Sequence, residues 1–496
     1  MQPWNGVSTA FGCGVSTSST DDRWLSLSKQ SASRQARPAG LDGLDRRGLS
    51  MSKPGARGSV DSSPVKILVV GTGAREHAIV HALAHEQDGA GGDAHELHAA
   101  PGNPGIAEHA TLHGVDPLDG AAVATLAGSL QVDLVVVGPE APLVAGVADD
   151  VRAAGVPVFG PSAAAAQLEG SKAFAKDVMA AASVPTAMAH VCTSLDQVAE
   201  ALDAFGAPYV VKDDGLAAGK GVVVTSDRDE ALAHAAECFE ARGAGGRVVI
   251  EEYLDGPEVS LFCVCDGETV VPLSPAQDFK RALDGDEGPN TGGMGAYSPL
   301  DWAPEGLVDE VVERVAQPTV DEMARRGTPF SGILYVGLAL TSRGTRVVEF
   351  NARFGDPETQ VVLSRLQTPL SAVMLTAARG ELAGLPRLRW SDDVAVTVVV
   401  AAEGYPASPR KGDPITGVAE AEALEGVHVL HAGTSVSPEH PLVSAGGRVL
   451  SVVGQGRDLD AARERAYAGV ALIGLADSQH RTDIAAKAAA GEVAAL

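Results

Sequence analysis

The chain has 496 residues, of which 45% are hydrophobic and 21% charged, and its formal net charge at pH 7 is −26. An acidic surface of this kind argues against general binding to nucleic acid or to a membrane surface, so an anionic ligand must be held by a local site. The length allows three or four domains of ordinary size. No apolar run is long enough to cross a bilayer, so we expect no membrane span.

Residues 1–64 differ in composition from the rest of the chain. They are rich in Ser, Gly and Arg and show little apolar periodicity, which is typical of a disordered extension. A secretory signal is disfavoured because a charged start followed by an apolar core is missing, and several early aspartates weaken the alternative of a transit peptide. Met51 is an alternative start of the protein.

The cysteines are few, odd in number and scattered, and none forms a CxxC motif. This pattern is typical of reduced, buried thiols in an enzyme of the cytoplasm. Cys263 and Cys265 stand two apart in an apolar run, so they should share one face of a strand.

Residues 65–166 alternate short apolar runs with helical stretches. An apolar run over 65–70 precedes the loop of "GTGAREH", and "DLVVVGPEAPL" (133–143) and "VPVFGPS" (156–162) repeat the arrangement. Short buried strands between helices predict a doubly wound parallel sheet. Each loop follows the carboxyl end of a strand, which is the edge where ligands bind in such sheets.

The "GTGAREH" loop is a poor match to a dinucleotide-binding fingerprint. Glu76 stands where a third glycine should permit close packing of helix on strand. This residue argues against a nicotinamide-dependent dehydrogenase. A phosphate at the start of the following helix remains compatible with the loop, because helix N-terminal N–H groups point at anions.

A lysine- and glycine-rich pattern begins after residue 167. "SKAFAKD" predicts a helix with Lys172 and Lys176 one turn apart. In "VVKDDGLAAGKGVVV" (210–224), two β-branched runs flank a glycine-rich loop, with Lys212 at the end of the first run. Glycines let backbone N–H groups approach anionic oxygens and lysines supply charge, which favours a polyphosphate site. A hairpin with a solvated tip is the alternative.

"RVVEFNARFGDPETQ" (346–360) is the second informative stretch. Glu349 and Asn351 are two apart in a strand and should project from one face. A carboxylate beside an amide oxygen suits Mg²⁺, whose remaining ligands are water and substrate phosphates. The alternative is an edge strand with two polar residues facing water. Arg353 and Asp356, which follow around a Gly-Pro turn, make that alternative less attractive.

"IEEYLDGPE" (250–258) predicts a strand that runs into a turn. Alone, its acidic residues would indicate a solvated loop. Between the lysine loop and the metal pair, its backbone around Glu252 and Leu254 could meet an adenine edge, and Glu258 could accept hydrogen bonds from ribose hydroxyls. A helix lysine, a lysine and glycine loop, an adenine-binding hinge and a metal-binding strand occur in the order typical of ATP-grasp enzymes.

Together these stretches resemble the phosphoribosylamine–glycine ligase family, also called glycinamide ribonucleotide synthetases. The resemblance covers about 65–496. It implies an α/β and α+β multidomain fold with a Rossmann-like N-terminal domain, an ATP-grasp domain with a mobile lid, and a small C-terminal α+β domain. The implied ranges are 65–166, 167–389 with the lid at about 187–257, and 390–496. The stretches that carry the resemblance include "GTGAREHA", "APGNPG", "GPEAPL", "SKAFAKD", "VVKDDGLAAGKGVVV", "EEYLDGPEVS", "QDFKR", "GPNTGGMGAYSP", "EFNARFGDPETQ", "EGYP", "RKGD" and "HAGT".

The resemblance also implies an activity and a set of site residues. The activity is ATP-dependent ligation of glycine to 5-phosphoribosylamine in purine synthesis, with Mg²⁺ or Mn²⁺, through a glycyl phosphate, and we expect a monomer. The implied nucleotide-binding residues are Lys172, Lys212, Gly219, Lys220, Gly221, Glu252, Leu254 and Glu258. The implied metal ligands are Glu349 and Asn351, and the implied catalytic residues are Arg353, Asp356 and Lys212.

Two residues depart from the patterns that the resemblance implies. Asp213 follows the strand lysine where the family commonly has alanine, so we expect its carboxylate to point away from the phosphates. Gly337 stands where many ATP-grasp enzymes carry a second metal-binding carboxylate, which puts a second metal ion in doubt. Asp278 and Lys280, together with the "NTGGMG" loop, are weaker candidates for the substrate site, and the "GTGAREH" loop is expected to approach the ribose phosphate.

Other functions remain as alternatives. One is another ATP-grasp carboxylate–amine ligase or a carboxylase, against which "NTGGMGAYSP" together with "EFNARFGDPE" argues. Another is a nucleotide-binding regulatory module, which should have lost Glu349 or Asn351. For His77 and His431 we favour a structural role.

Overall fold

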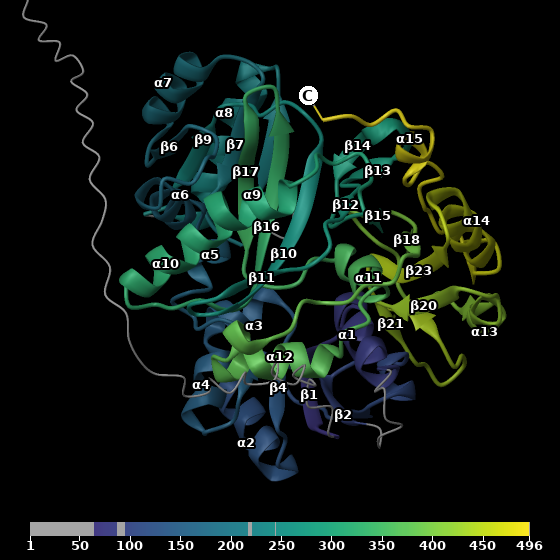
Figure 1. The fold of residues 1–496 in the computed structure, drawn as a ribbon. Helices are drawn as coiled ribbons and strands as arrows, with labels where there is room; N and C mark the ends of the chain where they lie inside the picture. Colours follow the sequence, from purple (N-terminus) through teal and green to yellow (C-terminus); the bar gives the residue numbers. More distant parts are fainter. Residues whose placement is uncertain (1–63, 87–94, 217–220, 244, 496) are drawn as a thin grey trace, which may run out of the picture. The chain divides into compact units, whose positions relative to one another are not determined.

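The computed structural model describes residues 64–86, 95–216, 221–243 and 245–495 (Figure 1). The predicted extension, apart from residue 64, and two predicted nucleotide-binding residues, Gly219 and Lys220, lie outside the described residues. None of the described helices is both long and apolar enough to span a membrane.

The first sheet is parallel and five-stranded, in the order β3-β2-β1-β4-β5. The order reverses between β1 and β4, so the loops "GTGAREH" and "GPEAPL" leave adjacent strand ends at the topological switch point. The strands are β1 (Lys66–Gly71), β2 (Glu96–Pro101), β3 (Thr111–Leu112), β4 (Leu134–Val137) and β5 (Val158–Phe159).

Helices cover both faces of this sheet. Alternate residues of a strand point to opposite faces, and in β1 both sets of side chains are buried. Leu68 and Val70 of β1 join a core cluster that includes residues of α2 and α4, whereas Ile67 and Val69 join the cluster of α1 and α12. Figure 1 shows these helices around the sheet. The doubly wound parallel sheet is therefore confirmed. The helices are α1 (Ala74–Ala84), α2 (Gly120–Leu130), α3 (Glu140–Ala145), α4 (Val147–Ala153) and α12 (Leu370–Arg379).

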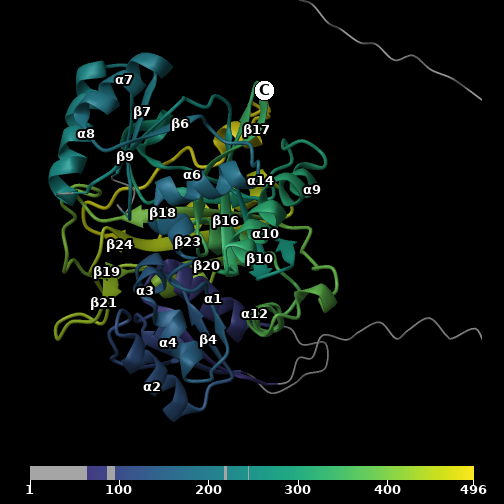
Figure 2. The same ribbon diagram turned by 90° about the vertical axis from the view of Figure 1, so that its left-hand side faces the viewer.

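The lysine and glycine stretch forms part of a second, antiparallel sheet in the order β6-β9-β7-β8. Lys212 pairs with Val222 across the loop, as expected for two strands that flank a glycine-rich turn. Helices α7 and α8 pack on one face of this sheet (Figures 1 and 2). The elements are β6 (Ala189–Cys192), α7 (Leu195–Phe205), β7 (Tyr209–Asp213), β8 (Val222–Thr225), α8 (Arg228–Arg242) and β9 (Val248–Glu251).

A third sheet carries the predicted metal pair. Its order is β11-β10-β16-β17, and neighbouring strands are antiparallel. The register shifts by one residue after Gly337, which pairs with Glu349. The strands are β10 (Glu258–Asp266), β11 (Val270–Pro272), β16 (Ser331–Thr341) and β17 (Gly344–Asn351). The helices of this part of the chain are α5 (Gln167–Gly170), α6 (Lys172–Ala181), α9 (Leu307–Val311), α10 (Gln317–Arg325) and α11 (Glu358–Leu363), with a π-helical turn over Val312–Ala316.

A fourth sheet crosses the predicted boundary at residue 390. Its order is β12-β15-β18-β23-β20, so β15, from the predicted ATP-grasp range, pairs with the first strand of the predicted C-terminal domain. Helix α14 packs against β18 and β23. The elements are β12 (Gln277–Asp278), β15 (Gly295–Ser298), β18 (Val394–Ala401), β20 (Val427–His431), β23 (Arg448–Gly456), α13 (Val418–Glu422), α14 (Leu459–Val470) and α15 (Ala486–Ala489).

The four cysteines in the described part of the chain are free and buried, as expected. Cys263 and Cys265 both lie in the main core cluster, on one face of β10. Burial raises the pKa of Cys263 to about 12, which makes it an inert core residue.

Six histidines gather where α1 packs against β20. The His81 ring stacks on His428 with a centroid distance of 4.7 Å and on His85 with 4.2 Å. The backbone N–H of His431 donates to Nδ1 of His77 at 2.8 Å. These contacts support the structural role expected for His77 and His431. The cluster consists of His77, His81, His85, His109, His428 and His431.

We expect this histidine cluster to make the fold acid-sensitive. Burial lowers the pKa of His81 to about 2 and that of His428 to about 4, whereas an unfolded histidine has a pKa of about 6.5. The unfolded state therefore binds more protons below about pH 6.5, and stability should fall from there as the pH decreases, by about 1 kcal/mol per pH unit for each ring.

Chemical unfolding at pH 7 and pH 5.5 checks this expectation. His428→Gln should lose less stability between the two pH values than the wild type. His440 is exposed, and within the described residues it forms hydrogen bonds through its backbone atoms alone, so His440→Gln provides the matched control. Equal pH dependence in the wild type and both variants would contradict the expectation.

Candidate nucleotide and substrate site

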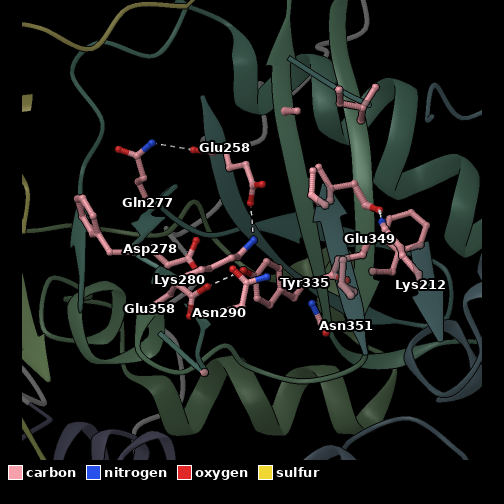
Figure 3. Close-up of a pocket in the computed structure, with 18 of the residues that line it drawn as sticks. Lys212, Glu258, Gln277, Asp278, Lys280, Asn290, Tyr335, Glu349, Asn351 and Glu358 are labelled. Carbon is pink, nitrogen blue, oxygen red and sulfur yellow. Dashed lines mark hydrogen bonds and ion pairs between the residues drawn. The ribbon is translucent and has the colours of Figure 1, made fainter. Parts of the chain in front are cut away.

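A cavity of about 1020 Å³ lies among the second, third and fourth sheets and the α5–α6 segment. Figure 3 shows Lys212, Glu349 and Asn351 on one side of it and Glu258, Asp278 and Lys280 on the other. Every predicted site residue in the described part of the chain lines this cavity: Lys172, Lys212, Gly221, Glu252, Leu254, Glu258, Glu349, Asn351, Arg353 and Asp356. The structure thus brings together residues that are up to about 180 positions apart in the chain, although their roles remain predictions.

Lys212 is held at the end of β7 by a buried ion pair. Its Nζ lies 2.9 Å from Glu251 and donates to the carbonyl of Val348 at 3.2 Å. Glu251 also pairs with Lys176 at 3.0 Å. Burial opposes the charge of Lys212, but Glu251 and Glu349 raise its pKa above the ordinary value, so its ammonium group stays charged. Lys172, at the start of α6, donates to the carbonyl of Gly215 at 3.2 Å.

Glu349 and Asn351 lie side by side at the end of β17 and face the cavity. Burial alone would raise the pKa of Glu349, but Lys280, Lys212 and Lys172 lower it below the ordinary value, so the carboxylate is ionised. An ionised carboxylate and an amide oxygen fit a hard cation whose other ligands are phosphate oxygens and water. Within the described residues, no three His, Cys, Asp or Glu side chains form a metal-binding group.

Gly337 lies directly opposite Glu349 across the β16–β17 pair. A Cβ atom at Gly337 would lie 3.5 Å from Cγ of Glu349. Gly337 therefore lies beside the predicted metal ligand Glu349 but has no side-chain oxygen to offer a cation. The two remaining donors, Glu349 and Asn351, fit one cation better than two.

The predicted adenosine residues, Glu252, Leu254 and Glu258, line the same cavity. Glu252 accepts a hydrogen bond from the backbone of Met188 at 3.1 Å and pairs with Arg343 at 2.9 Å. Glu258 pairs with Lys280. Burial opposes the charge of Lys280, but Asp278 and Glu258 raise its pKa well above the ordinary value.

Asp278, a weaker candidate from the sequence, also lines the cavity. Burial raises its pKa to about 7, and the nearby Glu358 and Glu258 add to that effect, whereas Lys280 opposes it. Glu358 itself accepts a hydrogen bond from the Tyr335 hydroxyl. The part of the cavity around Asp278 therefore combines an acid that can hold a proton near neutral pH with the charged groups of Lys280 and Glu258. Substrate-binding cavities often contain such groups.

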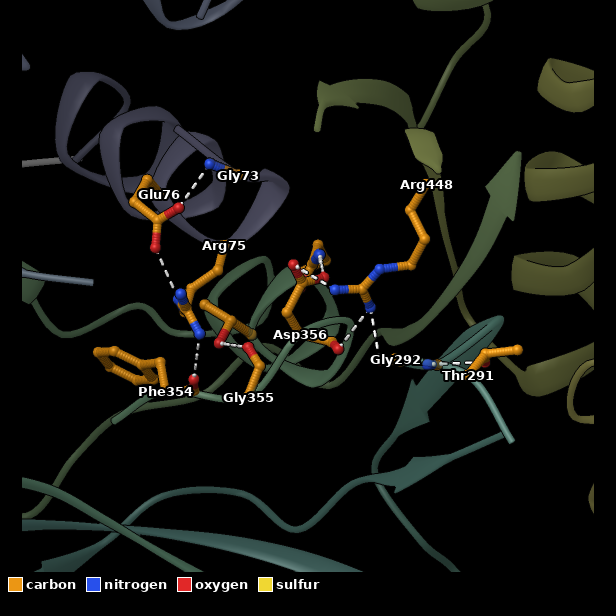
Figure 4. A network of polar contacts seen from close by, with 12 residues as sticks. Gly73, Arg75, Glu76, Thr291, Gly292, Phe354, Gly355, Asp356 and Arg448 are labelled. Carbon is orange, nitrogen blue, oxygen red and sulfur yellow. Dashed lines mark hydrogen bonds and ion pairs between the residues drawn. The ribbon is translucent and has the colours of Figure 1, made fainter. Parts of the chain in front are cut away.

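Arg353 and Asp356 follow β17 and are both engaged by other residues. Arg353 pairs with Glu140 at 3.1 Å and with Glu169 at 3.0 Å. Asp356 accepts a hydrogen bond from Arg448 at 3.1 Å, and its backbone carbonyl accepts another at 2.7 Å (Figure 4). Arg448 thus joins β23 to the cavity wall.

The "GTGAREH" loop contains a carboxylate at the switch point of the first sheet. Glu76 accepts a hydrogen bond from the N–H of Gly73 at 2.6 Å and from Arg75 at 2.6 Å (Figure 4). Its side chain fills the space under the loop, because a Cβ atom at Gly71 or Gly138 would collide with it. The charge of this carboxylate would oppose a dinucleotide pyrophosphate, which adds to the packing argument from the sequence against a dinucleotide. Of this loop and helix start, only Arg75 lines the cavity.

Asp213 makes its contacts away from the cavity, as expected, because side chains alternate along β7. Its carboxylate pairs with Arg242 of α8 at 2.7 Å. The additional acid therefore stabilises the helix on the sheet and does not line the cavity.

Sequence reasoning missed several cavity residues. Glu140, Glu169 and Glu251 approach the predicted site through contacts between distant segments, which no local pattern indicates. Residues 492–494 near the chain end also line the cavity, and their sequence carries no signal of that position.

Comparison with known proteins supports the family resemblance that the sequence motifs indicate. Three family models match the chain: the N domain of phosphoribosylglycinamide synthetase over residues 65–169, its ATP-grasp (A) domain over 170–359 and its C domain over 395–487. The phosphoribosylamine–glycine ligase of Streptomyces coelicolor is 68% identical over 427 residues, which cover 86% of this chain and 100% of that protein.

The chain belongs to the phosphoribosylglycinamide synthetase family.

Solved structures agree with this membership. The crystal structure of phosphoribosylamine–glycine ligase from Thermotoga maritima is 32% identical and matches with a TM-score of 0.71, covering 85% of this chain and all of that one. The biotin carboxylase domain of a 2-oxoglutarate carboxylase from Hydrogenobacter thermophilus matches with a TM-score of 0.60 over 85% of this chain and 92% of that one. At 16% identity this second likeness shows the fold alone. The family-model ranges lie near the predicted domain boundaries, which remain predictions.

Proposed function

We propose that this chain ligates glycine to 5-phosphoribosylamine with ATP, giving glycinamide ribonucleotide, ADP and phosphate. The observation that carries the proposal is the cavity in which Lys172, Lys212, Glu349 and Asn351 meet, in a chain that matches all three family domains. The relatives are named phosphoribosylamine–glycine ligases. A ligation that consumes ATP suits a cavity with two lysines for phosphates and a carboxylate–amide pair for a cation. We also infer that the protein acts in the cytoplasm as a monomer.

The residue roles follow from position and charge. Lys172 and Lys212 offset the charge of the ATP phosphates, Glu252 and Leu254 contact adenine through their backbone, and Glu258 holds the ribose. The loop residues Gly219 and Lys220, with Gly221, are proposed to cover the phosphates. Arg353 and Asp356 orient the substrates.

Glu349 and Asn351 would hold Mg²⁺ or Mn²⁺. When bound, the cation neutralises charge on the β- and γ-phosphates. An ionised Glu349 beside an amide oxygen is the donor set that such a cation prefers. The lysines around Glu349 keep it ionised at neutral pH, so the site does not depend on a proton being lost first.

The reaction is proposed to pass through glycyl phosphate. A glycine carboxylate oxygen attacks the γ-phosphorus, and the bond from that phosphorus to the bridging oxygen breaks, which releases ADP. The amine nitrogen of phosphoribosylamine then attacks the acyl carbon. The carbon–oxygen bond breaks, phosphate leaves with one former glycine oxygen, and the nitrogen loses a proton. Water must be excluded meanwhile, because acyl phosphates hydrolyse.

Product analysis tests the proposed function. ATP and Mg²⁺ are mixed with the protein, with and without glycine and freshly made phosphoribosylamine. The proposal predicts that phosphate and ADP accumulate only when both substrates are present. Bicarbonate-dependent phosphate release without glycine would instead support the alternative of a carboxylase.

A further inference from the structure

Glu169 is a buried carboxylate whose two partners follow β17, the strand that carries the predicted metal ligands. It lies in the short helix α5 and is 9% exposed. Its Oε2 accepts a hydrogen bond from the N–H of Ala352 at 2.7 Å, and its Oε1 lies 3.0 Å from Nη2 of Arg353. Both partners directly follow Asn351. One carboxylate thus holds the segment that leaves β17.

The segment that contains Glu169 also carries Lys172, one of the two lysines proposed to contact the ATP phosphates. Three residues after Glu169 comes Lys172, the first residue of α6. Ser171 between them caps α6 and donates its hydroxyl to Asp214 at 2.9 Å. The α5–α6 junction therefore contacts the end of β17 through Glu169 and the loop after β7 through Ser171.

The geometry of Arg353 depends on this contact. An arginine has five N–H donors in one plane. In Arg353, Nε donates to Glu140 at 3.1 Å, Nη1 to the carbonyl of Phe354 at 3.1 Å and Nη2 pairs with Glu169. Three directions of one planar group are thereby fixed, and the side chain still lines the cavity. Glu169, at 7% side-chain exposure, is the more buried of its two carboxylate partners, since Glu140 is 29% exposed.

We propose that Glu169 is a positioning residue, which holds Asn351 and Arg353 in place relative to Lys172. This inference rests on the proposed function, because it assigns Asn351 to the cation and Arg353 to the substrates. Glu169 acts through those two residues and needs no contact of its own with the nucleotide.

Glu169→Gln separates the two contacts of the carboxylate. Glutamine can still accept the hydrogen bond from Ala352 through its oxygen, but its amide nitrogen cannot accept from Arg353. Of the two ion pairs that Arg353 makes with described residues, the one with Glu140 then remains, and the guanidinium can rotate. We expect kcat to fall at least about tenfold, while KM for ATP changes by less than about threefold, because the lysines that bind the phosphates are untouched.

A binding measurement makes the test independent of turnover. ADP affinity is measured by calorimetry with and without Mg²⁺. The increase in affinity that Mg²⁺ gives the wild type should shrink at least about fivefold in Glu169→Gln, because the segment after Asn351 keeps its hydrogen bond at Ala352 but loses the contact that holds Arg353. Glu322→Gln is the matched control. Glu322 is also buried and pairs with Arg325 and Arg326, at 2.6 and 2.7 Å, but it does not line the cavity.

The outcomes separate the inference from the proposed function. A folded Glu169→Gln with wild-type kcat and wild-type Mg²⁺ dependence overturns the positioning role, as does an equal loss in Glu322→Gln. If Glu169→Gln does not fold, Glu169→Asp replaces it, since the shorter carboxylate cannot keep both contacts, and wild-type behaviour of that variant overturns the role. A wild-type protein that binds ADP with Mg²⁺ but does not ligate glycine overturns the proposed function alone, while the calorimetric comparison still decides the positioning role.

Discussion

Glu349→Gln is expected to lower kcat at least about a hundredfold without unfolding the protein. The substitution keeps the shape of the side chain but removes the charge that would hold the cation between phosphates, an interaction worth several kcal/mol at the transition state. Glu349 is ionised because Lys280, Lys212 and Lys172 surround it. Without its charge these ammonium groups repel the cation further. Raising the Mg²⁺ concentration should restore part of the activity.

Steady-state turnover over a range of Mg²⁺ concentrations measures this effect. Glu268→Gln serves as the control, because Glu268 is exposed and lies outside the cavity. Melting curves of both variants should match the wild type. Wild-type turnover of Glu349→Gln at ordinary Mg²⁺ would place the cation elsewhere.

Lys212→Met is expected to reduce kcat/KM for ATP by about ten- to a hundredfold. The substitution removes charge-assisted contacts worth about 1.5–3 kcal/mol while keeping most of the side-chain volume. Glu251 retains Lys176 as a partner at 3.0 Å, so its buried charge is not left alone. We therefore expect the variant to fold, and the loss to appear in nucleotide binding and turnover.

Kinetics with ATP as the varied substrate check this prediction. Lys411→Ala, which removes an exposed lysine outside the cavity, should behave like the wild type. If the folded Lys212→Met variant shows wild-type kinetics for ATP, Lys212 does not contact the nucleotide.

The sequence predicted the site best where function lies in short stretches at strand ends. The spacing of Glu349 and Asn351 placed both on one face of a strand, and strand patterns placed Lys212 beside a glycine loop. Asp213 was expected to point away from the phosphates because of its negative charge, and the structure shows it paired with Arg242, on the side of the strand opposite to Lys212. These inferences needed only local geometry and charge.

Contacts between distant segments could not be predicted in this way. The sequence indicated no role for Glu169, and none for Glu251 beyond its place in an acidic stretch, yet they hold Arg353 and Lys212. Arg448 reaches Asp356 from a strand about ninety residues away. The sheet that joins β15 to β18 depends on backbone pairing across a predicted domain boundary, which no residue pattern specifies. Such features follow from how the chain packs.

The fate of oxygen from glycine tests the central claim most directly. The reaction is run with ATP, Mg²⁺, phosphoribosylamine and glycine whose carboxylate carries heavy oxygen, and the phosphate and nucleotide products are examined by mass. Attack of the carboxylate on the γ-phosphorus predicts ADP and one labelled oxygen in each phosphate released. Unlabelled phosphate, or AMP with pyrophosphate, would contradict the account and indicate a ligase that forms an adenylate.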